Sequence, residues 1–406
     1  MEWDVRTETA STKRKISHAF LFVMALLLFP SITYAIMVTY TRDYRYQASE
    51  ADSKLSSRTI ALEQVKRLLL EELGTYVISV TEVKDFAVTK DKIITFTAGI
   101  VSTIVLEEKW DGLTYYLKAE ISADTDDLIK AIDRVHKDPE QSMPLEAIRK
   151  RTEEALKEID DLKKEMGKGK VGKATQEKYA DAVNILNAMD WVKKGNSLVI
   201  NDFRLKEGMQ AYDKAIELDP NLAVAYSGRA SIYIEWEFWQ KAIRESGQAI
   251  KLDPNLALAF NWRGAAHIGM EEYKTGLEDL NRATVLRPSW ATPYRNRSWA
   301  YWKMGKNNEA LAEANKAIDL AQNSNHFALG HFCKGRVLVE LGKFNEAIES
   351  FNKAIEYNPN FPRFYFFRGK AFLGINEKER GLEDITKAAR LGHKGAQRYL
   401  DSRGIR

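Results

Sequence analysis

The stretch AYSGRASIYIEWEFWQKAIRESGQAIKLDP, residues 225–254, aligns without a gap with AFNWRGAAHIGMEEYKTGLEDLNRATVLRP, residues 259–288. It also aligns without a gap with FYFFRGKAFLGINEKERGLEDITKAARLGH, residues 364–393. Six copies of this pattern recur at steps of 34, 34, 34, 37 and 34 residues, and they close at Ala215, Ala249, Ala283, Ala317, Ala354 and Ala388. Self-similarity at a fixed period indicates a stack of one repeated structural unit.

Small residues recur at two fixed places in each copy. One place lies midway along an expected first helix, at Ala230, Gly264, Ser298, Gly335 and Gly369; the other lies twelve residues later in an expected second helix, at Ala242, Gly276, Ala310, Ala347 and Gly381. Small side chains at facing positions let two helices approach closely. Proline cannot continue a helix, and it follows the second helix at Pro220, Pro254, Pro288 and Pro359. Each copy is therefore predicted to be a helix, a turn and a second helix.

A 34-residue helix-turn-helix unit of this kind resembles the tetratricopeptide repeat family, and the resemblance covers residues 188–392. Three departures lie at expected turns: an extra residue near 201–203, Gln322 in place of proline, and three residues inserted before the fifth copy. The resemblance implies a mainly α fold, a right-handed solenoid of six helix pairs, with residues 393–406 as a capping segment. It also implies a concave face that binds a partner protein or an extended peptide.

Basic and acidic residues vary together between the two helices of each repeat. The basic residues are Arg229, Arg263, Arg297 and Arg368, and sixteen residues later stand Glu245, Asp279, Glu313 and Asp384. The fifth copy has Lys334, and its partner position is Ser350. This covariation predicts an ion pair within each repeat. The alternative is a ladder of arginines that binds phosphate groups.

The concave surface of this family is lined by first-helix residues that flank the packing positions. Carried onto this chain, the resemblance implies a groove formed by Arg295, Trp299, Trp302, Phe332, Arg336, Phe366 and Lys370. Large aromatic side chains beside arginine are typical of binding hot spots. We therefore expect an acidic or apolar extended segment in this groove, and the alternative is that several of these aromatic side chains pack between neighbouring repeats.

The N-terminal region predicts a membrane location. Residues 16–40 contain no Lys, Arg, Asp or Glu, and a helix of about 25 residues would cross a bilayer core of roughly 30 Å. The basic residues Lys13, Arg14 and Lys15 place residues 1–15 in the cytoplasm by the positive-inside rule. We therefore expect a single-pass anchor in the inner (cytoplasmic) membrane with the rest of the chain in the periplasm. The alternative is a signal peptide cleaved after Ala35, which would leave a periplasmic or secreted protein.

Residues 50–137 are predicted to form a small α+β domain. The order is a helix with Leu69 and Leu73 on one face, a strand at 75–83, a hairpin turning at Asp111 and Gly112, and a helix capped by Asp124. This unit is faintly similar to N-terminal modules of bacterial surface lipoproteins and of flagellar T-ring assembly proteins, without a shared motif. We expect it to be a place where an envelope assembly could oligomerise.

Residues 144–166 are predicted to form a charged, coiled-coil-like helix. Its seam at alternating steps of four and three is Ile148, Thr152, Ala155, Ile159, Leu162 and Met166. The seam indicates either self-association or packing on a neighbouring domain. Residues 167–180 are predicted to be a flexible hinge. Their GxGxxG spacing follows a charged helix instead of a strand, which argues against a nucleotide-binding loop.

Composition and spacing argue against several classes of function. The formal net charge of +4 over 406 residues is too small to indicate a nucleic-acid-binding face. The single cysteine, Cys333, excludes disulfides within one chain, and the six histidines show no metal-binding spacing. We therefore expect a non-enzyme without metal or cofactor, which acts as a membrane-tethered periplasmic scaffold. Alternatives are a secreted adaptor, a structural component of an envelope assembly and an accessory subunit of an enzyme.

Overall fold

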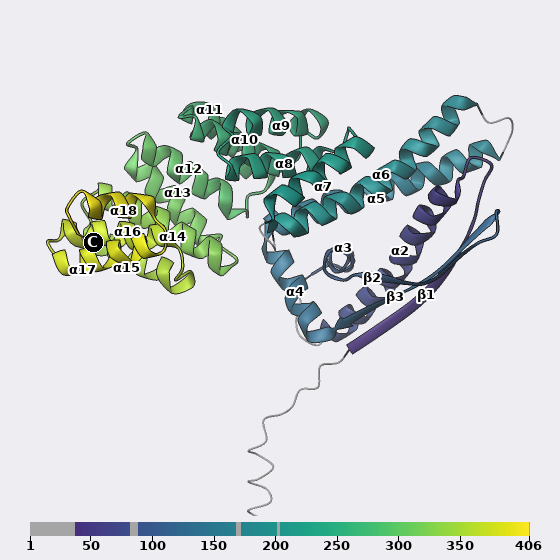
Figure 1. Ribbon diagram of the computed structural model, residues 1–406, viewed down its shortest axis with the longest axis horizontal. Coiled ribbons are helices and arrows are strands. Elements are labelled where there is room, and N and C mark those ends of the chain that lie inside the picture. The colour runs from purple at the N-terminus through teal and green to yellow at the C-terminus, as the bar shows by residue number, and fades with distance from the viewer. Residues whose placement is uncertain (1–36, 82–87, 168–171, 201–203, 406) are drawn as a thin grey trace, which may run out of the picture.

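The computed structural model describes residues 37–81, 88–167, 172–200 and 204–405 (Figure 1). Helices dominate this part of the chain, as the sequence predicts. A three-stranded antiparallel sheet in the order β1-β3-β2 lies at the N-terminal end. Its strands are β1 (Met37–Gln47), β2 (Thr103–Trp110) and β3 (Thr114–Asp124). The helices of this N-terminal unit are α2 (Lys54–Thr81), α3 (Lys90–Ile100), α4 (Thr125–Lys137) and α5 (Pro139–Met166).

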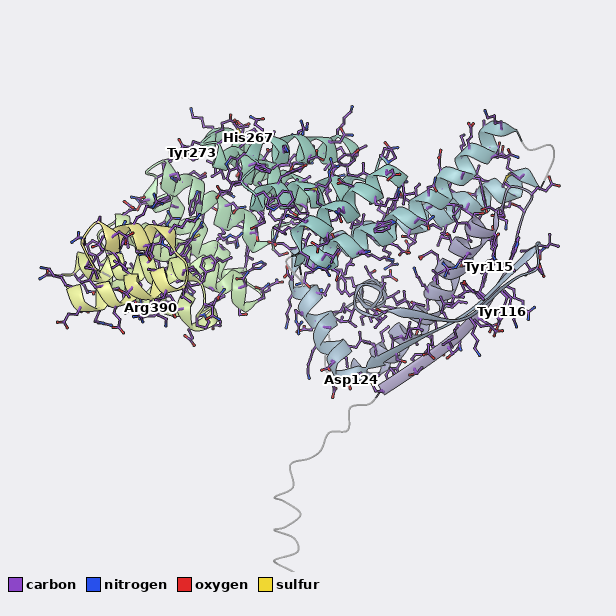
Figure 2. All side chains as sticks on the ribbon, viewed as in Figure 1. Tyr115, Tyr116, Asp124, His267, Tyr273 and Arg390 are labelled. Atoms are coloured by element: carbon purple, nitrogen blue, oxygen red, sulfur yellow. The ribbon has the colours of Figure 1, made fainter. Side chains whose placement is uncertain are left out.

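The predicted hairpin and the predicted helix cap are both present. Asp111 and Gly112 connect β2 to β3, and Gly112 takes a φ of 97°, which glycine adopts without strain. The Asp111 carboxylate accepts hydrogen bonds from the backbone N–H groups of Leu113 and Thr114. At the far end of β3, the carboxylate of Asp124 accepts a bond from the Asp127 N–H and caps α4 (Figure 2).

The membrane-segment prediction is wrong at its C-terminal boundary. Residues 37–40 belong to β1, and Met37 to Gln47 pair with Asp124 to Thr114 of β3 in a continuous antiparallel ladder. Apolar residues such as Met37 and Val38 continued the uncharged run, so hydropathy alone could not separate the strand from it. Residues 1–36, which hold the rest of the predicted segment, lie outside the described residues. No helix in the described part of the chain is long and apolar enough to cross a bilayer.

The strand predicted at 75–83 is also wrong, because residues 75–81 continue α2 as a helix. The apolar positions Leu69, Leu73 and Val77 keep the helical step of four, and all three side chains are fully buried. Gly74, which suggested a helix end, instead permits close packing. A Cβ atom at this position would lie 2.7 Å from Cγ1 of Ile94 on α3. The strand β1 and the helix α3 had no counterpart in the prediction.

The charged helix α5 runs antiparallel to α6 (Lys173–Ile200), and the two lie side by side in Figure 1. The predicted seam is buried within the chain: Ala155 and Ile159 share one apolar cluster with Leu186 of α6. The seam therefore packs on a neighbouring element and is not available for self-association. The predicted hinge is wrong for residues 173–180, which are helical. Self-association through the α+β unit stays a prediction.

Six consecutive helix pairs follow, and α6 serves as the first helix of the first pair. Its partner is α7 (Leu205–Leu218), and the next pairs are α8 (Ala223–Glu235) with α9 (Trp239–Leu252), α10 (Ala257–Gly269) with α11 (Tyr273–Leu286), and α12 (Ala291–Lys303) with α13 (Asn307–Asp319). The last two pairs are α14 (Ser324–Glu340) with α15 (Phe344–Tyr357) and α16 (Pro362–Gly374) with α17 (Lys378–Arg390). Helix α18 (Lys394–Asp401) packs on the last pair through Ala396 and Leu400.

The small residues and the prolines act as the sequence predicts. A Cβ atom on Gly264 would lie 2.8 Å from the carbonyl oxygen of Gly276, so glycine at both positions permits α10 and α11 to touch. Ala230 and Ala242 are fully buried at the same positions of the preceding pair. The second helices α7, α9, α11 and α15 each end two residues before a proline.

The predicted ion pairs within repeats are confirmed. Arg263 donates from Nε and Nη2 to the two carboxylate oxygens of Asp279, both at 2.7 Å. The same geometry joins Arg368 to Asp384, and ion pairs also join Arg229 to Glu245 and Arg297 to Glu313. The acidic partners are largely buried. These arginines are therefore committed to the fold and do not form a phosphate-binding ladder.

The N-terminal unit and the first repeats share one apolar core, which extends from Tyr46 of β1 to Ile232 of α8. Polar groups reinforce this joint: the hydroxyl oxygens of Tyr46 and Tyr179 of α6 lie 2.7 Å apart, and both hydroxyls lie within hydrogen-bond distance of the Asp52 carboxylate, at 3.1 and 2.7 Å. A second contact lies at the start of α5, where Met143 packs in a cluster with Leu256 and Trp290.

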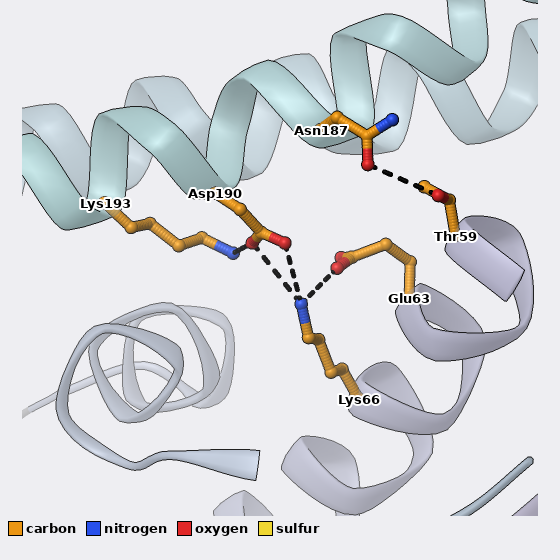
Figure 3. Close-up of polar contacts among 6 residues, drawn as sticks. All are labelled: Thr59, Glu63, Lys66, Asn187, Asp190 and Lys193. Atoms are coloured by element: carbon orange, nitrogen blue, oxygen red, sulfur yellow. Dashed lines mark hydrogen bonds and ion pairs between the residues drawn. The ribbon is translucent and has the colours of Figure 1, made fainter. Parts of the chain in front are cut away.

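A network of charges joins α2 to α6 (Figure 3). The Lys66 Nζ lies 2.5 Å from Glu63 and 3.1 Å from Asp190, and Lys193 also donates to Asp190 at 3.4 Å. Burial lowers the pKa of Lys66, but the charges and hydrogen bonds of Glu63 and Asp190 outweigh burial and hold the pKa above its usual value. Thr59 adds a hydrogen bond to Asn187.

We predict that Lys66→Met lowers the free energy of unfolding by about 1–3 kcal/mol, because it leaves the buried Glu63 carboxylate without its partner. Lys193→Met is the matched control. It removes the same charge from the same network but leaves Lys66 in place, so its cost should stay below about 1 kcal/mol. Urea unfolding followed by circular dichroism measures both, and equal costs would contradict the assignment.

Candidate functional site: the concave groove of the repeats

The first helices of the repeats line a cavity of about 510 Å³ that runs from α8 to the start of α18. Its apolar wall includes Ile234, Ala265, Ile268, Trp299, Phe332 and Phe367. These apolar side chains come from successive first helices, and Trp239 and Tyr273 at the starts of the second helices α9 and α11 complete the aromatic part of the lining. The cavity is therefore the hollow of the repeat stack, and it is open along one side of the array.

Arg336 of α14 is the most distinctive residue of this groove. Its side chain is only 6% exposed, and its guanidinium carbon lies 3.7 Å from the ring centroid of Trp302 and 4.0 Å from that of Trp299. Phe367 lies at 4.9 Å on the next first helix. Such cation–π contacts stabilise a positive charge but do not neutralise it.

No carboxylate within the described residues forms an ion pair with Arg336, and its Nε atom has no hydrogen-bond partner there. Burial lowers the pKa of Arg336 to about 10, so the group is still protonated at neutral pH. The four paired arginines of the repeats differ in this respect, because each has an acidic partner. Arg336 therefore presents a desolvated and uncompensated cation to the groove.

The seven residues predicted from the resemblance do not all face the cavity. Trp299, Phe332 and Arg336 line it, and Trp302 packs behind Arg336. Phe332 is also buried against Phe364 and Phe367, as the packing alternative anticipated.

The other three predicted residues lie elsewhere. The charge of Arg295 acts on Glu140 of α5: burial raises the Glu140 pKa, but His326, Arg295 and Thr292 outweigh burial and lower it. Arg295 is not among the residues that line the cavity. Phe366 stacks on His393 with ring centroids 4.5 Å apart, and Lys370 is exposed with its ammonium 5.8 Å from the Phe366 ring. The role of these residues in binding a partner stays a prediction.

Sequence reasoning missed two acidic residues of the cavity lining, Glu237 and Glu271. Each lies in the turn between the two helices of its repeat, with backbone φ angles of 58° and 65°. Later repeats have Gly305, Gly342 and Asn376 at this position, all with positive φ. The signal was present in the repeat alignment, because glutamate in a column of glycine and asparagine is unexpected where the backbone is left-handed.

The cavity lining also contains Lys303 and Arg363, which the prediction did not include. They lie at the end of α12 and the start of α16, on either side of Arg336 along the stack. Both are exposed, and neither forms an ion pair with another described residue. The basic part of the groove is thus wider than Arg336 alone.

The described residues do not gather three or more His, Cys, Asp or Glu side chains in a group able to hold a metal ion. The glycine-rich sequence at 167–172 follows the helix α5, where a nucleotide-binding loop needs a preceding strand. Residues 168–171 themselves lie outside the described residues. Aromatic side chains around a buried cation form an arrangement that is suited to binding.

Two family models match the array. One described as TPR repeat matches residues 335–375, and one described as tetratricopeptide repeat matches residues 291–324. The chain therefore contains tetratricopeptide repeats, a class that typically forms non-catalytic scaffolds for protein–protein interaction. The matched residues include Trp299 of α12 and Arg336 of α14, which line the groove, whereas Phe332 lies between the two matches. No curated protein sequence matches the chain.

One solved structure resembles the fold at a TM-score of 0.50, and two others are less similar. The chain is similar to a structure of the APC/C hetero-tetramer Cut9-Hcn1, with 13% identity over 68% of this chain and 58% of that chain and a TM-score of 0.50. A tetratricopeptide repeat protein from Parabacteroides merdae is 19% identical over 62% of this chain and 98% of its own, with a TM-score of 0.45. YrrB, described as a TPR protein with an unusual peptide-binding site, is 22% identical over 48% of this chain and 99% of its own, with a TM-score of 0.35.

We predict that Glu271→Gly leaves the free energy of unfolding unchanged or raises it by up to about 1 kcal/mol. A left-handed conformation costs a residue with a side chain roughly 1–2 kcal/mol, and the extra backbone freedom of glycine offsets about 0.5–1 kcal/mol of the gain. Thermal and urea unfolding measure the change. A loss above about 1 kcal/mol would show that the Glu271 side chain stabilises the fold instead of serving the groove.

Proposed function

We propose that this chain is a scaffold protein that holds an extended segment of a partner protein in the concave groove of its repeats. The observation that carries the proposal is Arg336, a cation that is 6% exposed and has no carboxylate partner among the described residues. A buried charge without a partner lowers stability. A carboxylate from a bound segment would supply charge-assisted hydrogen bonds to N–H groups of the guanidinium.

The surroundings of Arg336 fit the same role. Trp299, Trp302 and Phe367 hold the guanidinium plane in place before a ligand arrives, so little side-chain freedom is lost on binding. Aromatic residues beside an arginine are the side chains that most often dominate a binding interface. The neighbouring apolar wall of the groove offers sites for alternate side chains of an extended segment.

We predict that Arg336→Met weakens capture of the partner by tenfold to more than a hundredfold, because a hydrogen bond to a charged group contributes about 1.5–3 kcal/mol. Methionine keeps an apolar stem inside the aromatic cage, so the fold should be retained. Crosslinking in intact cells followed by mass spectrometry identifies the partner, and titration of the purified pair then gives the dissociation constant.

Lys251→Met is the matched control for this experiment. It removes one positive charge from the exposed surface of the second helix α9, outside the groove. The control should leave the dissociation constant within about twofold of the native value. An Arg336→Met protein that is folded and binds its partner as tightly as the native chain would contradict the placement of the site.

We further propose that the scaffold works in a bacterial envelope, with its repeats in the periplasm. The support is the sequence of the N-terminal region: residues 16–36 carry no charged side chain other than a titratable histidine, His18, and three basic residues precede them. A run of this length would still cross a bilayer core as a helix. In this form residues 16–36 tether the array to the inner membrane.

A released form is the second candidate, and one observation favours it. Strand β1 begins at Met37, directly after the small-residue cleavage pattern that ends at Ala35. The apolar side chains Met37 and Val38, which extended the uncharged run past that pattern, belong to the sheet. Cleavage after Ala35 would therefore leave the sheet and the repeats intact as a secreted or periplasmic adaptor.

We predict that protease added to intact cells does not digest the native protein until the outer permeability barrier is opened. The reason is that the repeats lie outside the inner membrane. N-terminal sequencing then separates the two forms. A tethered protein begins at or near Met1 and sediments with membranes, whereas a released protein begins at Ile36. A protein that stays protected until the inner membrane is lysed would contradict both forms.

A further inference from the structure

We propose that the groove selects a segment that carries both signs of charge: a carboxylate that binds at Arg336 and a lysine or arginine side chain that binds between Glu237 and Glu271. This inference rests on the proposed function and specifies the chemistry of the partner segment. It depends on the order of charged residues along the cavity. The lining is acidic at the second and third repeats and basic at the fourth to sixth repeats.

The acidic end of the groove is formed by Glu237 and Glu271. They stand 34 residues apart at the same position of consecutive repeats, both line the cavity, and both side chains are exposed. Neither carboxylate forms an ion pair with a described residue. The turn that carries Glu271 lies between His267 and Tyr273, which Figure 2 labels at the outer edge of the array.

The backbone conformation at Glu237 and Glu271 indicates that these side chains have a role. The turn requires a positive φ, and the following three repeats meet that requirement with glycine or asparagine. Glutamate has no local advantage there, so the two turns are strained relative to the others. Strained positions that cluster at one cavity point to a use for the side chain. Two carboxylates on adjacent turns form a site that a cationic side chain would fit.

The basic end of the groove is formed by Arg336, Lys303 and Arg363. Arg336 is the independent observation that points to a ligand, because its unpartnered guanidinium is more than nine-tenths buried and lines the same cavity. Lys303 and Arg363 add positive charge from the neighbouring first helices α12 and α16. Apolar side chains, including Ile268 and Phe332, lie in the lining along with the two charged ends.

Charge complementarity then excludes segments of a single sign. A uniformly acidic segment would satisfy Arg336 but would bring like charge to Glu237 and Glu271, and a uniformly basic segment would meet three cations at the other end. Like charges brought together at an interface cost binding free energy and reject the wrong partner. A segment with an acidic group, an apolar middle and a basic group pairs favourably with the whole cavity.

Three pools of fluorescein-labelled synthetic peptides of about twelve residues, with blocked termini, test this inference on the full-length chain. One pool has two lysines near one end and two glutamates near the other, one has glutamates at both ends and one has lysines at both ends. All three share the same random mixture of Ala, Ser, Leu and Phe in the middle. Fluorescence anisotropy at low salt should give the mixed-charge pool an affinity about tenfold above each single-sign pool.

Variants connect the preference to the named residues. The double variant Glu237→Gln and Glu271→Gln keeps side-chain shape and should remove the advantage of the mixed-charge pool over the acidic pool. Arg336→Met should weaken both of those pools. The double variant Glu349→Gln and Glu356→Gln on α15 makes the same charge change at exposed residues of a second helix, and it should leave the order of affinities unchanged.

The outcomes separate the two proposals. If the acidic pool binds the native chain as tightly as the mixed-charge pool, or if the Glu237 and Glu271 variant leaves the order unchanged, the two-charge inference is wrong and the scaffold proposal stands. If none of the pools binds, the groove does not take extended peptides, and both proposals are wrong.

Discussion

The contact between the two helices of each repeat is the constraint on which the rest of the structure depends. At Gly264 and Gly276 the backbones touch so closely that a single methyl group would collide with a carbonyl oxygen. At this contact there is no room for a large side chain between α10 and α11, and aromatic residues of the first helices such as Trp299, Phe332 and Phe367 line the cavity. The hollow of the stack is thus a consequence of packing. In four of the six pairs, an arginine–carboxylate ion pair also joins the two helices.

The fold of the array could be predicted because each repeat serves as an alignment for the others. Covariation between Arg263 and Asp279, and its joint loss at Lys334 and Ser350, indicated a contact without a structure. The N-terminal unit offers only one copy of each element. There the sequence around Val77 fits both a strand pattern and a helix pattern, and in the structure Val77 continues the helix α2. The uncharged N-terminal run concealed β1, because hydropathy does not distinguish an apolar strand from the end of an apolar helix.

The candidate site was predictable only in part, for a geometric reason. The resemblance identified Trp299, Phe332 and Arg336, which line the cavity, whereas Arg295 is not among the residues that line it. Contacts between one repeat and the next depend on the twist of the stack, which the repeat pattern does not specify. The aromatic cage of Arg336 is built from three successive first helices and could not be assembled from one helix at a time. Glu237 and Glu271 were missed because what distinguishes them is a positive backbone φ angle, which is known only from the structure.

The N-terminal unit and the array form one continuous body through α6, which pairs with α5 on one side and with α7 on the other. The direction in which the groove opens is therefore determined by the sheet and the helices before it. Hydrogen–deuterium exchange on the native chain, with and without its crosslink-identified partner, tests the central claim most directly. The account predicts new protection in the first helices α10, α12, α14 and α16, with little change in the second helices α11, α13 and α15. Protection confined to the second helices or to the sheet would contradict it.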